Sequence, residues 1–403
     1  MKILHVSHLL INNEVISGKS LAFDKTIEKI APLEELLLSY PDAEVIDTPP
    51  EAIVMPGLIN SHVHLEFSAN KTQLKYGKFM PWLHSVIENR EELIGNCSTE
   101  CMQEATKKML DSGTTTFGAI SSHGMDLEAA ELAQQNVIYF NEVIGSQATM
   151  ADALFGDFKS RLEASETVKR EGFTPAVAIH SPYSVHPALI KKALDLVRLR
   201  NYPLSAHFME SPAERDWLDS NDGEFKPFFN EFLKQDYAVN TPKEFLELFS
   251  DIPTLFTHVV HATKEELDIL TDANHTVIHC PISNRLLGNG ALDLDAIEAQ
   301  NINWVCGTDG LSSNYDLNLF EEMKAALFMH SDAQLLPLAK SLLNSVTIDA
   351  AKALKLNTGE IKIGKNADLI VLDIKEEPNE QLPLHMILHQ YPIIQTIING
   401  KVI

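Results

Sequence analysis

The chain carries, at residues 56–66, the stretch Pro56-Gly57-Leu58-Ile59-Asn60-Ser61-His62-Val63-His64-Leu65-Glu66, an apolar run that ends in His-x-His. Successive side chains of a β-strand alternate between its two faces, so His62 and His64 point the same way. Two imidazoles on one face at the end of a strand form half of a metal site. The alternative is that both histidines fall in a polar turn, and polar residues later in the chain favour the metal.

Outward from this stretch, the middle of the chain alternates between apolar, strand-like runs and amphipathic helical stretches. The apolar runs are 58–64, 114–119, 137–143, 176–180, 204–207, 254–260, 275–280 and 304–308. The helical stretches include 99–110, 127–134, 187–199, 264–270 and 317–328. This alternation is typical of a parallel sheet, and eight strands favour an α/β fold with a closed (β/α)8 TIM barrel over an open sheet. No Gly-x-Gly-x-x-Gly follows an early strand, which argues against dinucleotide binding. We expect residues 56–359 to form the barrel.

The two ends of the chain have a different character, with short strands and turns. The N-terminal segment predicts strands at 2–10, 14–23, 27–31 and 43–47 and a helix at 33–39. The C-terminal segment predicts a strand at 369–373 and a hairpin of 393–398 and 401–403 around Asn399-Gly400. Because chain ends often lie close together, we expect residues 1–55 plus 360–403 to form one small composite β-sandwich domain.

Composition narrows the function classes. The chain has 403 residues, 45% of them hydrophobic, and a formal net charge of −24. An acidic protein lacks the basic patches that nucleic acid or an anionic membrane requires, so neither is an expected partner. There is no signal-peptide pattern, no apolar run long enough to span a membrane and no Cys-x-x-Cys pair, and we expect a cytoplasmic protein.

Residues 216–236 form an insertion that is rich in acidic and aromatic side chains. A lid, a subunit contact and an ordinary helical decoration are all compatible with this composition.

Metal-type and titratable residues follow six of the eight predicted strands. They are His62, His64, His180, His207, Glu210, His258, His279 and Asp309. In a (β/α)8 barrel the carboxyl ends of the strands carry the catalytic residues. Three imidazoles and one carboxylate, with a position left for water, describe a catalytic divalent metal site.

The same residues offer proton transfer. Such a metal makes hydroxide available near neutral pH, and an ionised Asp beside it takes up the proton of water and returns it to a leaving group. Glu210 lies three residues beyond His207, where a carboxylic acid can protonate a ring nitrogen as hydroxide adds to the adjacent carbon. His258 can hold the developing oxyanion.

Several motifs together carry a resemblance to a known family. They are the stretch at 56–64, His207-Phe208-Met209-Glu210, His258-Val259-Val260-His261, His279-Cys280-Pro281-Ile282-Ser283-Asn284, Gly307-Thr308-Asp309-Gly310 with Ser313-Asn314, and the terminal Gly364 to Asp373 and Ile398 to Val402. This sequence resembles the amidohydrolase superfamily, in its mononuclear branch of aminohydrolases that act on aromatic rings. The resemblance covers essentially the whole chain.

The resemblance implies metal ligands His62, His64, His207 and Asp309. It implies Glu210 and Asp309 as proton carriers and His258 as the residue that orients hydroxide. Two-metal members carry a bridging lysine at the end of strand 4, where this chain has His180-Ser181-Pro182-Tyr183, so one metal is expected. Zinc is the first choice and iron the alternative. A homodimer is implied by the family alone.

The expected substrate is an amino-substituted nitrogen heterocycle. The likeness is strongest to deaminases of 6-amino-6-deoxyfutalosine, an adenine nucleoside with a benzoate-like group on the route to menaquinone. We expect His180, Trp82 and Ser283 to contact the substrate, and Arg285 to meet its carboxylate, although Trp82 could instead be a helix-packing residue.

Other functions stay open at this point. One alternative is deamination of S-adenosylhomocysteine, 5′-methylthioadenosine or adenosine. Another is a chlorohydrolase or a cyclic-amide hydrolase on the same scaffold, which release of chloride or ring opening would reveal. The last is a non-enzymatic relative, which would bind no metal.

Overall fold

Eight parallel strands follow one another in sequence order around a barrel in a computed structural model that describes residues 1–70 and 73–403. Their bounds are β8 (Leu58–Val63), β9 (Thr114–Ser121), β10 (Asn136–Val143), β11 (Phe173–Ile179), β12 (Leu204–Phe208), β13 (Leu255–His258), β14 (Thr276–His279) and β15 (Asn303–Cys306). The backbone N–H groups of Thr308 and Asp309 both donate to the carbonyl oxygen of His62, at 3.1 Å, and so join the end of β15 to β8. The predicted barrel is confirmed.

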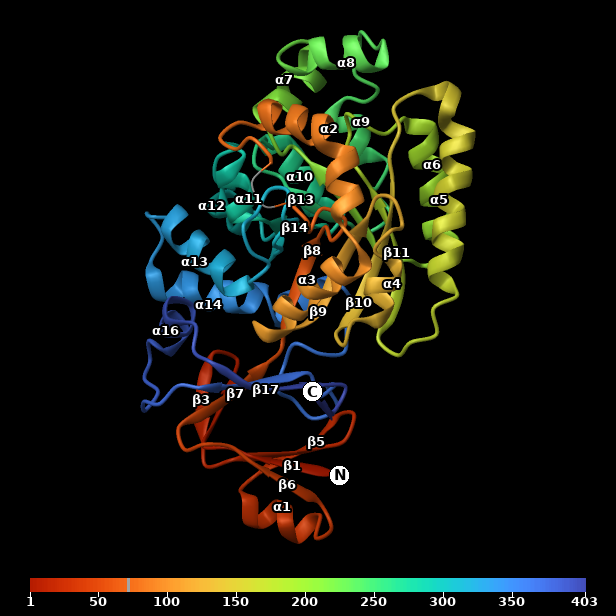
Figure 1. Ribbon diagram of the computed structural model, residues 1–403. Coiled ribbons are helices and arrows are strands. Elements are labelled where there is room, and N and C mark those ends of the chain that lie inside the picture. The colour runs from red at the N-terminus through yellow and green to blue at the C-terminus, as the bar shows by residue number, and fades with distance from the viewer. Residues whose placement is uncertain (71–72) are drawn as a thin grey trace.

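Helices surround these strands (Figure 1). Those of the barrel are α2 (Phe79–Asn96), α3 (Thr99–Asp111), α4 (Leu127–Leu132), α5 (Ala151–Glu166), α6 (Pro187–Arg200), α7 (Pro212–Ser220), α8 (Phe225–Leu233), α9 (Pro242–Glu247), α10 (Lys264–Asp272), α11 (Pro281–Leu286), α12 (Leu294–Ala299), α13 (Leu319–Met329), α14 (Leu335–Ser345) and α15 (Ile348–Ala353). The sequence explains where these helices begin and which face they bury. Helix α10 begins at a capping box between Thr263 and Glu266. Helix α3 buries one stripe of its surface, which includes Met102, Ala105 and Met109. None of the described helices has the length and apolarity to cross a bilayer.

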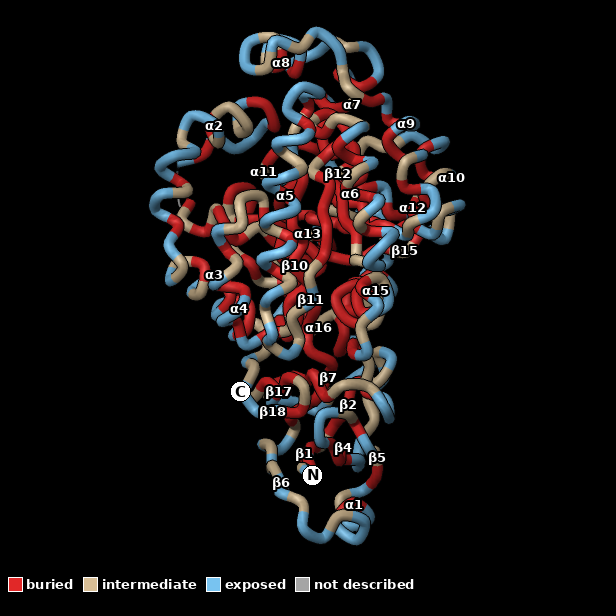
Figure 2. The backbone as a smooth tube through the Cα atoms, turned by 90° about the vertical axis from the view of Figure 1, so that its right-hand side faces the viewer, coloured by how far each residue is buried: buried red, intermediate tan, exposed pale blue. Residues whose placement is uncertain are grey.

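The barrel strands are buried on both faces, as the red tube in Figure 2 shows. All eight residues of β9, Thr-Thr-Thr-Phe-Gly-Ala-Ile-Ser, are buried. A strand that is covered by helices on one side and by the barrel interior on the other has no polar face, which is why these runs are nearly continuous in apolar and β-branched residues.

A second, smaller domain lies at the narrow end of the molecule, below the barrel in Figure 1, and contains both chain termini. One sheet has the order β5-β4-β1-β6, and the other has the order β18-β17-β16-β7-β2-β3. Their strands are β1 (Lys2–His5), β2 (His8–Ile11), β3 (Glu14–Ser17), β4 (Ser20–Phe23), β5 (Ile27–Ala31), β6 (Glu44–Asp47), β7 (Ala52–Pro56), β16 (Leu369–Asp373), β17 (Ile393–Ile398) and β18 (Lys401–Val402), with helix α1 (Leu33–Ser39). The predicted sandwich of both chain ends is confirmed, and the division at residues 55 and 360 stays a prediction.

Two predicted strands, 2–10 and 14–23, are wrong, because each of these segments forms two strands in different sheets. The chain leaves one sheet at Val6-Ser7 and enters the other, so that Leu4 of β1 and Leu9 of β2 share one core between the sheets. Within the C-terminal segment, α16 (Leu382–His389) contacts α13 and α14 of the barrel.

Candidate active site

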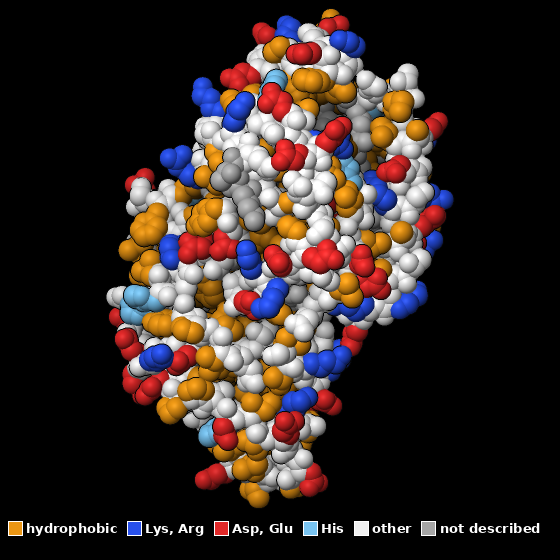
Figure 3. All heavy atoms as spheres, in the orientation of Figure 1, with side chains coloured by type: hydrophobic (Ala, Val, Ile, Leu, Met, Phe, Trp, Pro, Cys, Tyr) orange, Lys and Arg blue, Asp and Glu red, His pale blue; other side chains and the backbone are white. Residues whose placement is uncertain are grey.

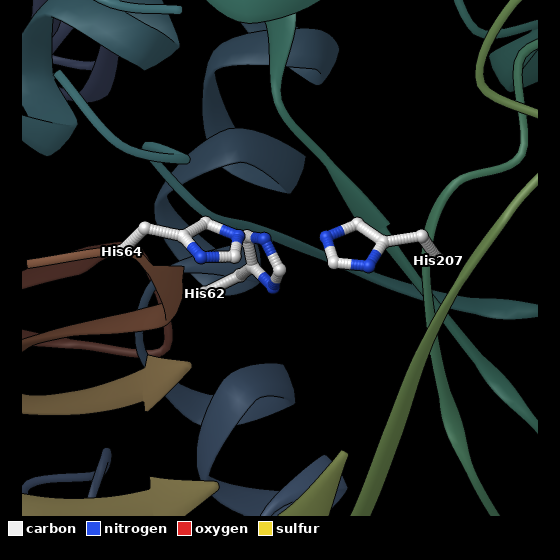
Figure 4. A group of neighbouring side chains, drawn as sticks. All are labelled: His62, His64 and His207. Carbon is white, nitrogen blue, oxygen red and sulfur yellow. The ribbon is translucent and has the colours of Figure 1, made fainter. Parts of the chain in front are cut away.

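Three imidazoles converge at the carboxyl end of the barrel (Figure 4). His62 and His64 come from the end of β8 and His207 comes from β12, and one ligating atom of each lies within 4.8 Å of the others. The Oδ1 atom of Asp309, just beyond β15, lies 3.5 Å from Nε2 of both His62 and His64. The structure therefore brings together the four residues that the resemblance names as metal ligands.

The hydrogen bonds behind these imidazoles orient them toward a cation. Nδ1 of His207 lies 2.7 Å from the carbonyl oxygen of His180. Because a carbonyl oxygen only accepts, Nδ1 carries the proton and Nε2 keeps its lone pair. Nδ1 of His62 lies 3.3 Å from Oγ1 of Thr257, while its buried Nε2 has no hydrogen-bond partner among the described residues. A buried nitrogen without a partner, next to a carboxylate, fits a bound divalent metal.

Protonation states agree with this interpretation. Burial, with His62 next, lowers the pKa of His64 to about 4, and burial also lowers the pKa of His207 well below its ordinary value. Burial alone would raise the pKa of Asp309, but contacts with His62 and His64 hold it well below its usual range. Near pH 7 His64 and His207 offer neutral nitrogens and Asp309 offers an ionised carboxylate, which are ligands that suit a divalent transition metal.

The loop that carries Asp309 is tightly fitted against His62 and His64. Oδ2 of Asp309 accepts hydrogen bonds from Ser283 at 2.7 Å and from Ser313 at 2.6 Å, which leaves Oδ1 facing the imidazoles. The glycines on either side permit this approach. A Cβ atom on Gly307 would lie 2.8 Å from the Cβ of His62, and one on Gly310 would lie 2.9 Å from the Cβ of His64.

Gly310→Ala is therefore expected to weaken metal binding by about 10- to 100-fold, because the loop must retreat from His64 and take Asp309 with it. Competition with a chelating dye measures the affinity. Gly156→Ala is the matched control, since a Cβ at this exposed position in α5 meets nothing within 4 Å and the substitution should only stabilise the helix. Equal metal affinity in the two variants would contradict the proposed packing.

Glu210 lies beyond the end of β12 with a buried carboxyl group. Its Oε1 accepts a hydrogen bond from Nδ2 of Asn289 at 3.2 Å and lies 3.6 Å from Nε2 of His258. Burial, followed by the negative charges of Asp309 and Glu214, raises the pKa of Glu210 well above its ordinary value. This shift favours the protonated form of Glu210, which can donate a proton.

His258 is buried at the end of β13 and has a left-handed backbone, with φ of 74°. Its Nδ1 lies 3.0 Å from Oδ1 of Asn284, so Nε2 points toward Glu210. Burial lowers the pKa of His258 to about 4, and the ring is therefore neutral.

Glu214 holds the turn that presents Glu210, and sequence reasoning missed it. Its carboxylate accepts from the backbone N–H of Met209 at 3.1 Å and from that of Glu210 at 2.7 Å. The Ser211-x-x-Glu214 pattern at the start of α7 signals a buried carboxylate near a helix N-terminus and could have identified it.

Glu142 was also missed. Glu142, His180 and His207 form a second group of neighbouring ligand atoms, and Oε1 of Glu142 lies 3.8 Å from Nδ1 of His207. That nitrogen is already occupied by the carbonyl of His180, so the first group is the better metal site. The polar pair Asn141-Glu142 at the carboxyl end of an apolar run was the available signal.

A cavity of about 490 Å³ opens above the imidazoles. This volume lies in the range for small-molecule sites. Trp82 and His180 line it as expected, and Nε1 of Trp82 donates to the carbonyl of Ser312 at 2.8 Å. Two residues that were predicted to contact the substrate do not line the cavity. Ser283 is fully buried behind Asp309, and Arg285 is exposed on α11.

The insertion 216–236 covers this cavity. Its helix α8 contributes Phe228, Phe229 and Leu233 to the lining. Phe225 packs on Phe79 of α2 with ring centroids 5.9 Å apart. The helices α2 and α8 therefore form adjoining walls, and the insertion is part of the site rather than a decoration.

A parallel (β/α)8 barrel with three histidines and an aspartate at the carboxyl ends of its strands defines the class of metal-dependent barrel hydrolases. The chain belongs to the amidohydrolase family, whose profile matches residues 53–403.

Comparison with individual proteins shows which members of this family the chain resembles. The chain is 47% identical over 403 residues to the aminodeoxyfutalosine deaminase of a Nitratiruptor species, covering 100% of this chain and 99% of that one. It is 34% identical to an adenosine deaminase of Helicobacter pylori, with coverage of 96% and 95%. The fold matches the crystal structure of Helicobacter pylori aminofutalosine deaminase in complex with methylthio-coformycin with a TM-score of 0.95, at 33% identity over 100% of both chains.

Proposed function

We propose that this enzyme deaminates an adenine nucleoside hydrolytically, with 6-amino-6-deoxyfutalosine as the preferred substrate and futalosine and ammonia as products, in menaquinone biosynthesis. The observation that carries the proposal is the buried carboxyl group of Glu210, 3.6 Å from Nε2 of His258, beside a cluster of three histidines and Asp309. Full-length identity of 47% to an aminodeoxyfutalosine deaminase supports the choice of nucleoside.

His62, His64, His207 and Asp309 would hold one divalent metal ion, with Zn²⁺ as the first choice and Fe²⁺ as the alternative. When bound, this ion supplies Lewis-acid activation of a water molecule near neutral pH.

Asp309 and Glu210 carry the protons of the reaction. Asp309 is ionised and accepts a proton from the attacking water, whose oxygen adds to the ring carbon that bears the amino group. Glu210 is protonated and donates to the adjacent ring nitrogen, and Nε2 of His258 orients the attacking oxygen. Asp309 then gives its proton to the amino group, which leaves as ammonia, while the added hydroxyl group becomes a carbonyl and its proton returns to the carboxylate of Glu210.

Two residues of the cavity wall would hold the nucleoside. Trp82 lines the cavity from α2, and His180 lines it from the end of β11. We assign them to substrate binding, whereas Ser283 orients Asp309 through its hydroxyl group.

Ammonia release from a panel of amines tests this function. The panel is 6-amino-6-deoxyfutalosine, S-adenosylhomocysteine, 5′-methylthioadenosine, adenosine, adenine and guanine. A strong preference for the first compound supports the proposal, and a preference for 5′-methylthioadenosine or S-adenosylhomocysteine would make this a salvage deaminase. Release of chloride from a chlorinated triazine without any deamination would overturn the nucleoside assignment.

Asn289→Ala is expected to move the alkaline limb of the kcat/KM profile to higher pH. Activity requires protonated Glu210 and is lost as pH rises through its pKa. The hydrogen bond from Asn289 stabilises the ionised carboxylate and lowers that pKa, so its removal raises the pKa further. A pH–rate series measures the shift, with Asn301→Ala, at an exposed site after α12, as control. A limb that moves to lower pH would contradict the role of Glu210 as the acid.

A further inference from the structure

Helix α2 presents one continuous stripe to the cavity. The lining residues on this helix, spaced by three and four, are Phe79, Trp82, Leu83, Val86, Ile87 and Arg90. This spacing places them on a single face of the helix. The stripe is apolar until it ends in a guanidinium group. Among the described residues that line the cavity, Arg90 is the only lysine or arginine.

The two ends of the stripe lie at different distances from the imidazoles. Trp82 donates to the carbonyl of Ser312, three residues after Asp309, so this part of α2 lies beside the candidate metal site. Arg90 is two helical turns farther on, about 12 Å along the helix axis at 1.5 Å per residue. The cavity therefore offers a reacting end, an apolar wall and a distant cation, in this order.

The charge of Arg90 is not neutralised by the protein. The chain has 56 acidic and only 32 basic residues, yet Arg90 forms no ion pair with a carboxylate in the described part of the chain. Two of the three acids beside it on α2 are engaged elsewhere: Glu88 pairs with Lys75, and Glu92 accepts from Gln73. Because the helix surface is rich in acids, an arginine that faces the cavity without one is available to an anionic ligand.

His123 orients this guanidinium. Nη2 of Arg90 lies 3.2 Å from Nε2 of His123, which also lines the cavity. Burial, followed by the charge of Arg90, lowers the pKa of His123, so the ring is neutral and Nε2 accepts the hydrogen bond. The backbone N–H of His123 is fixed in turn by the carboxylate of Glu66, at 2.9 and 3.1 Å. The remaining N–H groups of the Arg90 guanidinium are free to donate to a carboxylate.

We propose that Arg90, oriented by His123, binds the carboxylate at the 5′ extension of the substrate and so determines which nucleoside this enzyme prefers. The inference rests on the proposed function, because 6-amino-6-deoxyfutalosine carries a carboxylate there and 5′-methylthioadenosine does not. The apolar members of the stripe would lie along the aromatic ring that separates that carboxylate from the ribose. Arg285, the contact expected from sequence, is replaced in this role.

Arg90→Ala tests the proposal through substrate preference. We expect kcat/KM for 6-amino-6-deoxyfutalosine to fall by about 10- to 100-fold, mainly through KM, while kcat/KM for 5′-methylthioadenosine changes by less than about twofold. Arg90→Lys keeps the positive charge but lacks the planar guanidinium that can donate two parallel hydrogen bonds. This variant should therefore retain a higher kcat/KM for 6-amino-6-deoxyfutalosine than Arg90→Ala. Arg200→Ala, at an exposed arginine on α6, should change neither substrate. An equal loss on both nucleosides, or a selective loss in Arg285→Ala instead, overturns the proposal.

Calorimetric titration with futalosine and with inosine separates this inference from the proposed function. Wild-type enzyme should bind the carboxylated product more tightly, and Arg90→Ala should remove the difference. If the wild-type enzyme prefers 6-amino-6-deoxyfutalosine and Arg90→Ala keeps that preference, the role of Arg90 fails alone. If the wild-type enzyme neither prefers that substrate nor binds futalosine above inosine, the proposed function fails and the role of Arg90 fails with it.

Discussion

Glu210→Gln is expected to lower kcat by about 10³- to 10⁴-fold, while leaving the fold and the metal content intact. The substitution keeps the size of the side chain and an amide oxygen to accept from Asn289, which lies 3.2 Å from Oε1. It removes the proton that, in the proposed mechanism, goes to the ring nitrogen, and Glu210 is the carboxyl group that lies beside His258 and lines the cavity. Ammonia release at saturating substrate gives kcat, and elemental analysis with circular dichroism checks metal and fold.

Glu214→Gln is the companion variant to Glu210→Gln. Glu214 accepts two backbone N–H bonds and is not among the described residues that line the cavity, so its amide should keep one of these contacts and cost activity much less. If Glu210→Gln retained kcat within about tenfold, a different group would have to supply the proton, because general acid catalysis contributes at least about 10²-fold.

Asp309→Asn is expected to abolish turnover to the background rate. An asparagine can still accept hydrogen bonds from Ser283 and Ser313, so the loop should keep its place beside Gly307 and Gly310. It lacks the charge that would bind the cation and the basic oxygen that, in the proposed mechanism, takes the proton from water. The loss of the base alone costs about 10²- to 10⁴-fold, and weaker metal binding adds to this.

Ser313→Ala separates these two contributions. It removes one of the two hydroxyl groups that orient Asp309, and outer contacts of this kind are worth about 10- to 100-fold in metal affinity. Excess zinc should restore most of the activity of Ser313→Ala and none of that of Asp309→Asn. Recovery of Asp309→Asn by zinc would show that Asp309 is a ligand only and takes no part in proton transfer.

The barrel could be predicted because its strands carry strong local signals. Runs such as 114–119 are short, β-branched and apolar throughout, since both faces are buried. The candidate metal site could be predicted for a related reason. Polar residues that follow such runs must lie at one rim of a parallel barrel, so His62, His207 and Asp309 converge whatever the loops between them do.

Substrate contacts could not be predicted in this way, because they depend on which face of a helix meets the cavity. Ser283 and Arg285 are two residues apart on α11, which is about 200° around the helix axis. When Ser283 turns inward to Asp309, Arg285 must turn outward to water. Trp82 and Arg90 lie eight residues apart on α2 and share one face. The sequence around them does not indicate that this face borders the cavity.

The strand errors in the small domain have a physical reason as well. Residues 2–10 are apolar almost without interruption, and local sequence favours one long strand. The break at Val6-Ser7 arises because the two sheets of the sandwich each take half of the segment, which is a tertiary requirement.

Surface charge fits an enzyme for a small molecule. On the face shown in Figure 3, acidic and basic side chains are interspersed and no broad basic patch forms. Long-range attraction of an anionic substrate is therefore weak, which is consistent with the proposal that Arg90 on the cavity wall provides the recognition.

Strand β7 lies between β2 and β16 in the six-stranded sheet. This position means that β7 is synthesised long before one of its two partner strands. As the ribosome delivers residues from the N-terminus, β7 appears before the whole barrel and its partner β16 appears after it. During that interval the open edge of β7 is exposed to any other extended polypeptide, which is a known route to aggregation. A chain stalled before Leu369 should therefore engage chaperones even though all eight barrel strands have been made.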